Sequence, residues 1–582
     1  MLVDADDERR LRARINTALG RRPADLVLKN GRIFNVFTGE FETGDVAVVG
    51  GVIAGVGDYQ GQEEIDLAGA YITPGFIDGH VHLESAMVSP SEFARGVVPA
   101  GTTTVVADPH EIANVCGAGG IRYMLAATEA LPLTVYFMLP SCVPATEMET
   151  AGAVLNAAAL QEFVGHPRVL GLGELMDYPG VINGRTDVLQ KILLAQDKRI
   201  DGHGPGLKGK ELTAYIAAGA RSDHECVTVQ EAWERLRQGM WLMLREGSAA
   251  HNLLELLPAV TPVTMERCML VTDDRQPKDL LQQGHINHLV RLAVAAGVEP
   301  ARVLRLATLN AARYFGLERL GAVAPGYLAN LLVFDELSEF RPRMVFCNGR
   351  LAAKNGQALF AMSPVADETV RQTMRLPEPA AMALRVSINT TVKRGRARVM
   401  GLVPGQLVTR ELIRDLPVRD GGLQADVIQD VVKVAVWERH HGTGRVGVSF
   451  LEGLGLKSGA IASSIAHDSH HLVAAGCCDE DMVVAATAVR QMGGGIVVVK
   501  DGKVLGELPL PLAGLMADRT LEVVQKELEI LHHQARELGV DQGHDPFMTL
   551  AFVSLPVIPE LKLTDLGLVD VDRQIFVSTV ME

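Results

Sequence analysis

The segment Pro74-Gly75-Phe76-Ile77-Asp78-Gly79-His80-Val81-His82 places two histidines, two residues apart, at the end of an apolar run. Residues i and i+2 of a β-strand point to the same side, so both imidazoles are directed at one point. An isolated pair of this kind is weak evidence, because 17 histidines in 582 residues produce such spacings by chance. The strand context gives the pair its meaning and predicts two metal ligands at a strand's carboxyl end.

Strand-like apolar runs alternate with helix-like amphipathic segments downstream of this point. The expected strands are residues 72–81, 103–107, 133–139, 169–172, 199–201, a weak one near Ala220, 240–244 and 269–272. The expected helices include residues 92–98, 113–130, 188–194 and 288–296. Eight alternating strands predict a (β/α)8 barrel of the TIM type, with an open doubly wound sheet as the competing architecture. Polar residues recur at strand ends, which favours the barrel.

Two further regions flank the expected barrel. Short strands joined by Gly and Asp turns fill residues 24–70, and the same pattern returns at 321–359, so the two pieces could pair into one small β-domain. A third region, from about Met382 to the end, mixes strands with a long helix and predicts a C-terminal α+β domain. The expected boundaries are 1–73 and 319–365 for the small β-domain, 74–318 for the barrel and 380–582 for the C-terminal domain.

Composition narrows the choice of partners and of location. The chain has 55 basic and 70 acidic residues, a formal charge of −15, so its surface repels nucleic acid and anionic membranes. Seven scattered cysteines without a CxxC pair indicate reduced thiols. The charged N-terminus lacks the apolar stretch of a signal peptide. We therefore expect a cytoplasmic protein that binds a small molecule and neither nucleic acid nor membrane.

Four more residues of metal-ligand type fall at the ends of later strands. They are Glu174, His203, His224 and Asp273. Together with His80 and His82 they offer four imidazoles and two carboxylates, a mixed set that suits Zn, Mn or Fe(II) rather than Ca or Mg. Six ligands exceed the need of one catalytic ion, so two divalent ions are expected, with the Glu174 carboxylate between them.

The chain resembles the amidohydrolase superfamily and, within it, the bacterial adenine deaminases. The resemblance covers residues 24 to beyond 514. It rests on the segments His80-Val81-His82-Leu83-Glu84-Ser85, Asp108-Pro109-His110-Glu111-Ile112-Ala113-Asn114-Val115, Arg245-Glu246-Gly247-Ser248-Ala249-Ala250, Thr272-Asp273-Asp274-Arg275, Gly284-His285-Ile286-Asn287 and His467-Asp468-Ser469-His470. Two positions depart from the pattern: Ala86 stands where a second serine is expected, and His471 where an asparagine is expected.

The resemblance implies a binuclear centre, commonly Mn or Fe(II), with Glu174 where many relatives use a carboxylated lysine. It also implies a homo-oligomer, expected to be a dimer, that hydrolyses adenine to hypoxanthine and ammonia in purine salvage. The zinc nucleobase deaminases that carry a PCxxC motif are a different class, and this sequence lacks that motif.

Catalytic roles follow from this chemistry. A metal lowers the pKa of bound water toward neutrality, so metal-bound hydroxide is the expected nucleophile at C6 of adenine. Asp273 is the expected proton shuttle to the leaving amine. Glu225, slightly ahead of Glu84, is the candidate acid for purine N1, although either could instead support a histidine. Arg245 and Ser248 are candidate substrate contacts, and Arg245 could equally hold a carboxylate ligand.

Other polar groups have weaker signals. His110 and Glu111 follow the second strand and are candidates for an accessory metal or substrate contact. We interpret the segment from His467 to His470 as a structural turn that approaches the barrel mouth, rather than as a second site or a serine triad. The pairs at 440–441 and 532–533 are expected to be surface or helix residues. The alternative functions are another amidohydrolase, acting on a cyclic amide or a different aminated heterocycle, and a non-catalytic scaffold.

Overall fold

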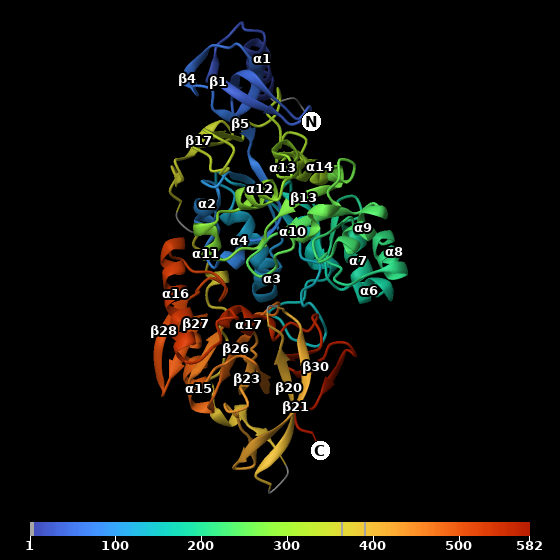
Figure 1. Ribbon diagram of the computed structural model, residues 1–582, viewed down its shortest axis with the longest axis vertical. Coiled ribbons are helices and arrows are strands. Elements are labelled where there is room, and N and C mark those ends of the chain that lie inside the picture. Colours follow the sequence, from blue (N-terminus) through green and yellow to red (C-terminus); the bar gives the residue numbers. More distant parts are fainter. Residues whose placement is uncertain (1–4, 363–364, 389–391, 405, 582) are drawn as a thin grey trace.

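The computed structural model describes residues 5–362, 365–388, 392–404 and 406–581. The molecule is elongated, and three parts follow one another along its long axis (Figure 1). A sheet built from the N-terminal strands and from strands that follow the barrel lies at one end. The barrel occupies the middle, and the C-terminal part, orange and red in Figure 1, lies at the other end.

The sheet at the N-terminal end joins segments from both sides of the barrel, as the sequence predicts. Its path runs β18-β17-β16-β15-β5-β1-β2-β3, with β4 paired to β1. The junction is the antiparallel pairing of β5 (Tyr71–Pro74) with β15 (Leu331–Phe334). The remaining strands are β1 (Ala24–Asn35), β2 (Glu40–Val49), β3 (Val52–Gly57), β4 (Gly61–Asp66), β16 (Met344–Cys347), β17 (Arg350–Lys354) and β18 (Gln357–Ala358).

The predicted strand at 72–81 is two strands. β5 ends at Pro74 and belongs to the small sheet, whereas β6 (Phe76–His82) opens the barrel. Gly75 separates them, and its N–H donates to the carbonyl of Asn330 at 2.8 Å. The bend at this glycine carries the chain from one sheet into the other and leaves the two histidines inside the barrel.

The barrel closes in the predicted order. Its strands are β6, β7 (Thr102–Ala107), β8 (Thr134–Leu139), β9 (Val169–Leu175), β10 (Arg199–Gly202), β11 (Ser222–Asp223), β12 (Trp241–Arg245), β13 (Cys268–Val271) and β14 (Asp273–Asp274). β14 continues β13 and pairs in parallel with β6, which closes the ring. Between β10 and β11 the Arg221 N–H donates to the carbonyl of Ile200 at 2.9 Å. Because the strands are covered on both sides, β7 is buried at every position.

Helices α2 (Pro90–Val97), α7 (Thr186–Leu194) and α12 (Ile286–Ala295) lie where the amphipathic pattern predicts them. The single helix expected at 113–130 is instead α3 (His110–Cys116) followed by α4 (Ala118–Ala127). Gly117 interrupts them with a φ of 58°, a left-handed conformation that a helix interior does not accept. As a result, His110 and Glu111 form the first turn of a short helix at the barrel mouth.

The C-terminal part is α+β, as predicted. A ten-stranded sheet runs β19-β22-β21-β20-β24-β23-β26-β25-β27-β28. Its longer strands are β20 (Arg394–Leu402), β21 (Thr409–Arg419), β23 (Val431–Trp437), β24 (Val446–Glu452), β27 (Gly495–Lys500) and β28 (Lys503–Pro509). The shorter ones are β19 (Val386–Ser387), β22 (Gly422–Leu423), β25 (Ala460–Ser463) and β26 (Leu472–Gly476). Three helices, α15 (Asp479–Gln491), α16 (Leu521–Glu537) and α17 (Pro546–Phe552), accompany it, and α16 and α17 face the barrel in Figure 1.

Contacts between the barrel and the C-terminal part are specific. The Ala517 N–H donates to the carbonyl of Met87 at 2.8 Å, directly after the strand that carries the histidine pair. Arg95 of α2 forms an ion pair with Glu522 across the same junction and a second one with Glu92 of its own helix. These bonds hold the C-terminal part over the carboxyl ends of the barrel strands.

A second set of contacts involves the loop that follows β8. The Thr150 hydroxyl donates to Asp565 at 2.8 Å, and the His441 Nε2 lies 2.8 Å from the carbonyl of Ala151. The surface prediction is wrong for His440, which is buried with its Nε2 2.7 Å from the carbonyl of Ser469. The neighbouring loop covers it, and sequence spacing carries no sign of that cover.

The domain boundaries at 1–73, 74–318, 319–365 and 380–582 stay predictions. Residues 1–4, 363–364, 389–391, 405 and 582, which belong to these ranges, lie outside the described residues. Within the described residues, each helix is too short or too polar to span a bilayer.

Candidate metal centre

Two imidazoles lie at the carboxyl end of β6, inside the barrel. His80 and His82 are both buried, with ring centroids 4.9 Å apart. The His82 Nδ1 lies 2.9 Å from the backbone carbonyl of Asp108, which leaves its Nε2 facing the barrel axis. A ring nitrogen fixed by a backbone carbonyl is the usual support for a metal-binding histidine.

Glu174, in β9, is placed between two groups of histidines. Its Oε1 lies 2.8 Å from the Nε2 of His82 and 3.3 Å from that of His80. Its Oε2 lies 2.8 Å from the Nδ1 of His203 and 3.6 Å from the Nε2 of His224. Each carboxylate oxygen thus addresses a different histidine pair.

Asp273 is the first residue of β14, the short strand that continues β13. Its Oδ1 lies 3.1 Å from the His82 Nε2 and 3.6 Å from the His80 Nε2. Its Oδ2 accepts a hydrogen bond from Arg245 at 2.9 Å. The backbone at Asp273 has a φ of 59°, a left-handed conformation that aspartate tolerates better than most residues.

The two carboxylates are held in their charged form. Burial alone raises the pKa of Glu174, but the charge of His82 and hydrogen bonds from the other histidines outweigh it and hold that pKa well below its usual range. For Asp273 burial is likewise outweighed, first by bonds from His80 and His82 and then by the charge of Arg245, and its pKa is also well below the ordinary value. Both carboxylates are therefore charged at neutral pH and available as anionic metal ligands.

A divalent ion fits this donor set. The His80 Nε2 and the Glu174 Oε1 are buried atoms without a hydrogen-bond partner. Such atoms are costly unless something else satisfies them, and imidazole nitrogen with carboxylate oxygen is a transition-metal donor set. Two of the groups that meet the distance requirement of a metal site contain these ligands: His80 with His82, Glu174 and Asp273, and Glu174 with His203 and His224. The structure therefore brings all six expected ligands together.

His110 and Glu111, given weak signals by the sequence, lie at this centre. The His110 Nδ1 is 3.7 Å from the Oε1 of Glu174, and it has no hydrogen-bond partner. Its Nε2 is 3.8 Å from the Oδ1 of Asp468, a residue of the C-terminal part. His82, His110 and Glu111 also form a group of metal-site dimensions. The segment around Asp468 thus reaches the barrel mouth, as interpreted from the sequence.

Glu225 and Arg245 form a buried ion pair beside the metal centre. Although burial raises the pKa of Glu225, the charges of Arg245 and His203 outweigh it and lower that pKa far below the usual value. Arg245 therefore binds two carboxylates, Glu225 and Asp273, which is the structural role left open by the sequence. The Ser248 hydroxyl donates to Asp279 at 2.5 Å and accepts from the Gln276 N–H at 2.9 Å, so it is already engaged within its loop.

Glu84 follows the histidine pair and lines a cavity at the junction with the C-terminal part. Burial and the nearby charge of Glu111 raise the pKa of Glu84 to about 8. Its Oε2 is buried without a hydrogen-bond partner, whereas its Oε1 accepts from the Ile112 N–H at 3.3 Å.

Sequence reasoning missed the residues that face this cavity from the C-terminal part: Ile465, Leu515 and Met548. Apolar residues carry no functional signal of their own. The proximity of Ile465 to the His467-Asp468-Ser469-His470 motif was the one available hint.

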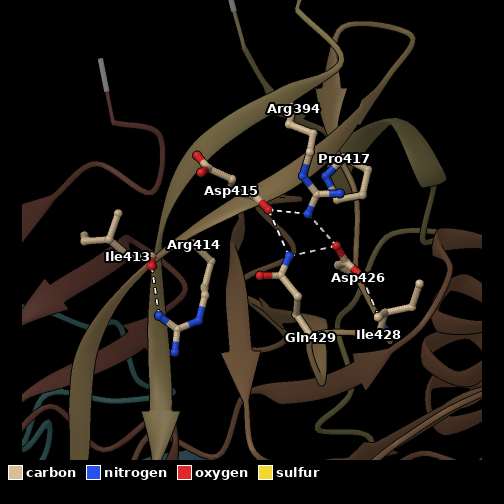
Figure 2. A pocket seen from close by; sticks show the side chains of 8 residues that line it. All are labelled: Arg394, Ile413, Arg414, Asp415, Pro417, Asp426, Ile428 and Gln429. Atoms are coloured by element: carbon tan, nitrogen blue, oxygen red, sulfur yellow. Dashed lines mark hydrogen bonds and ion pairs between the residues drawn. The ribbon is translucent and has the colours of Figure 1, made fainter.

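A second hollow lies far from the barrel, on β20 and β21 (Figure 2). Its polar groups satisfy one another. Arg394 and Gln429 both donate to the Asp426 Oδ2, at 2.6 and 2.8 Å, and both also bond to the carbonyl of Asp415. We do not consider it a functional site, because these paired groups leave little to recognise a ligand.

The fold and the metal centre together define the class: a barrel hydrolase of the amidohydrolase type with a divalent metal centre. Residues 71–352 match the family model of the amidohydrolase family, and residues 406–574 match that of the adenine deaminase C-terminal domain. The chain belongs to the adenine deaminase family, as the following relatives show.

Adenine deaminase 2 of Carboxydothermus hydrogenoformans is 61% identical, over 96% of this chain and 97% of that protein. An adenine deaminase of Nitratidesulfovibrio vulgaris is 49% identical over 96% of each chain. Among solved structures, one of an adenine deaminase covers 57% of this chain and 100% of its own, at 17% identity and a TM-score of 0.45.

Proposed function

We propose that this chain hydrolyses adenine to hypoxanthine and ammonia. The observation that carries the proposal is the Glu174 carboxylate between the histidines of β6 and those that directly follow β10 and β11, in a chain that belongs to the adenine deaminase family. The substrate is a small molecule, consistent with a net charge of −15 that disfavours nucleic acid.

The number and kind of metal ions are part of the proposal. Because each oxygen of Glu174 addresses a separate histidine pair, we infer two ions bridged by this carboxylate. His80, His82 and Asp273 would hold one ion, and His203 and His224 the other. The mixture of nitrogen and oxygen donors favours Mn²⁺ or Fe²⁺, with Zn²⁺ as a third choice.

Divalent ions bound there would lower the pKa of water, and so supply a hydroxide nucleophile for C6 at neutral pH. Asp273 is placed to move the proton, since Arg245 fixes its Oδ2 and leaves Oδ1 facing the histidines. From Oδ1 the proton would pass to the leaving amine, which departs as ammonia.

Two carboxylates are candidates for the acid that protonates purine N1. Glu225 was the slightly favoured candidate, but its Oε1 lies beside both Arg245 and His224, contacts that stabilise the charged carboxylate. The Oε2 of Glu84 has no protein partner, and the residue lines the cavity at the mouth of the centre. We therefore assign the acid role to Glu84 and a positioning role to Glu225 with Arg245. We propose that Ser248 contacts the substrate from its loop.

The decisive experiment measures product formation by protein loaded with Mn²⁺ or Fe²⁺. Ammonia and hypoxanthine are expected in equal amounts from adenine. The Asp273→Asn variant, purified in parallel, sets the level that a contaminating deaminase would give. Wild-type release no higher than that level would overturn the proposal.

We propose a homodimer, which the family resemblance implies and which sedimentation velocity tests. We propose a cytoplasmic location because the seven cysteines are free thiols, as in a reducing compartment. We propose that the release of hypoxanthine from adenine serves purine salvage.

A further inference from the structure

His285 belongs to a buried hydrogen-bond network beside the strand that carries the histidine pair. Its Nδ1 lies 2.9 Å from the Thr102 hydroxyl of β7. Its Nε2 lies 3.3 Å from the Thr272 hydroxyl and 3.3 Å from the Asp78 Oδ2. All four side chains are fully buried. A buried polar network is costly unless its members are satisfied, so its bonds impose one arrangement on the segments that they join.

Asp78 joins the first strand of the barrel to the last. It precedes His80 by two residues in β6, and its Oδ1 accepts a hydrogen bond from the His80 N–H at 3.1 Å. The same carboxylate accepts two bonds from Thr272, from the backbone N–H at 3.2 Å and from the hydroxyl at 2.5 Å. Thr272 directly precedes Asp273. Two proposed ligands on different strands, His80 and Asp273, are therefore tied together through one carboxylate.

The seam between these strands needs such a tie, because its backbone pairing is short. β14 has two residues, and it pairs with β6 through Asp273 opposite Val81 and Asp274 opposite His82. The chain also takes a left-handed conformation at Asp273, with a φ of 59°. A residue in this conformation persists only where its surroundings hold it. The bonds from Thr272 to Asp78 therefore help to define where the Asp273 carboxylate points.

The segment from Gly284 to Asn287 presents the His285 ring to this network. The His285 N–H donates to the Asn287 Oδ1 at 2.9 Å, and the Asn287 Nδ2 donates to the carbonyl of Phe340 at 3.4 Å. Gly284 has a φ of 96°, and a Cβ there would lie 2.4 Å from the Asn287 Oδ1. Glycine is therefore required beside this asparagine. The ring is fixed both at its backbone and at its two nitrogens.

The His285 ring takes part in the network as a neutral imidazole. Burial lowers the pKa of His285 well below its usual range. With its proton on Nε2, the neutral ring donates toward Asp78 and Thr272, and its Nδ1 accepts from the Thr102 hydroxyl. The Thr272 hydroxyl then donates its own proton to Asp78. Each donor in the network has an acceptor in this arrangement.

We propose that His285 is a positioning residue for the metal centre, which fixes the Asp273 carboxylate relative to His80 through Thr272 and Asp78. The kinetic part of this role rests on the proposed function, because Asp273 is the group that we propose to move the proton. The alternative is a purely structural role in closing the barrel, which would change stability alone.

Thr272→Val tests the tie, since valine keeps the shape of threonine and removes the hydroxyl that bonds to Asp78. The affinity of the apoprotein for Mn²⁺ should fall by about 10- to 100-fold, the effect of removing a group that supports a metal ligand. At saturating metal, kcat for adenine should fall by about 100-fold, because a small displacement of a reacting group has effects of that size. KM should stay within about threefold. Thr272→Ser keeps the hydroxyl and should restore both the Mn²⁺ affinity and kcat.

Thr102→Val and Thr104→Val form a matched pair of substitutions on β7. Both side chains are buried, but the Thr102 hydroxyl bonds to His285, whereas the Thr104 hydroxyl has no hydrogen-bond partner. Thr102→Val should weaken Mn²⁺ binding by about tenfold, and Thr104→Val should leave it unchanged. In the His285→Ala background, Thr102→Val should have no further effect, because Thr102 acts on the centre through the ring.

Unchanged Mn²⁺ affinity and kcat in Thr272→Val, with or without a lower melting temperature, would overturn the positioning role. Equal losses in Thr102→Val and Thr104→Val would overturn it as well, and this pair decides the question if Thr272→Val does not fold. A wild-type protein that binds Mn²⁺ but releases no ammonia would remove the deaminase proposal, and the Mn²⁺ affinities of the variants would still decide the role of His285. Failure of the wild type to bind Mn²⁺ would overturn both proposals.

Discussion

Replacement of the Glu174 carboxylate by an amide tests the bridged centre most directly. Glu174→Gln keeps the shape of a buried side chain but removes its charge and one of its two acceptor oxygens. In the wild type both oxygens lie 2.8 Å from an imidazole nitrogen, one from His82 and the other from His203. The amide oxygen can serve only one of these sides, so one of the two proposed ions would lose an anionic ligand.

The magnitude follows from the lost ligand. Groups that merely support a metal ligand change affinity by about 10- to 100-fold when removed, so loss of the bridge should weaken the second ion by at least about 100-fold, or roughly 2.7 kcal/mol. After gel filtration in metal-free buffer, elemental analysis should find about one ion per chain, against the two that we propose for the wild type. Glu246→Gln, a similarly buried glutamate that pairs with His251 and not with the centre, should keep both ions. Two retained ions in the Glu174 variant, with an unchanged melting temperature, would refute the bridge.

Four further substitutions test separate roles. Asp273→Asn should lower kcat by about 10³-fold with an intact fold, because it loses the proton shuttle; turnover within tenfold of wild type would exclude that role. Glu84→Gln should lower kcat about 100-fold and by more than Glu225→Gln, and the opposite order would return the acid role to Glu225. Burial lowers the pKa of Lys562 from 10.5 to about 7, so the unfolded chain binds the extra proton between these values and stability rises with pH there. Lys562→Met should remove this slope of up to about 1.4 kcal/mol per pH unit, and a pH-independent difference in unfolding free energy between the two proteins would contradict it.

The barrel and the meeting of the candidate ligands could be predicted because both follow short-range rules. Parallel strands are continuous apolar runs, and their ends meet at one face, so His80, His203 and Asp273 could be assigned to one site from their place after such runs. The two histidines spaced two residues apart at the end of β6 could be assigned to the site for the same reason. Glu174 was found by its position after β9, although its division between two histidine pairs needed coordinates.

The remainder depended on contacts between distant segments. Met548 and Glu84 line one cavity across more than 400 residues of chain, and no periodicity records such a meeting. The sequence predicted a surface position for His440, because nothing nearby in the sequence shows the loop that covers it. The helix predicted at 113–130 is too long, because an isolated glycine inside an apolar pattern is tolerated in some helices. Gly117 is not such a case, since it separates α3 from α4.

The position of the C-terminal part explains how so many charges coexist in the barrel mouth. Glu84, Glu111 and Asp468 are each almost fully buried, and Asp468 comes from the C-terminal part itself. A barrel without this cover would leave the same groups facing water, where their mutual interactions are weak. Under the cover, the low dielectric strengthens the pairing of His110 with Asp468 and limits the entry of bulk water. The site is therefore shared between the two parts, and the full chain, rather than the barrel, is the unit on which the proposed chemistry depends.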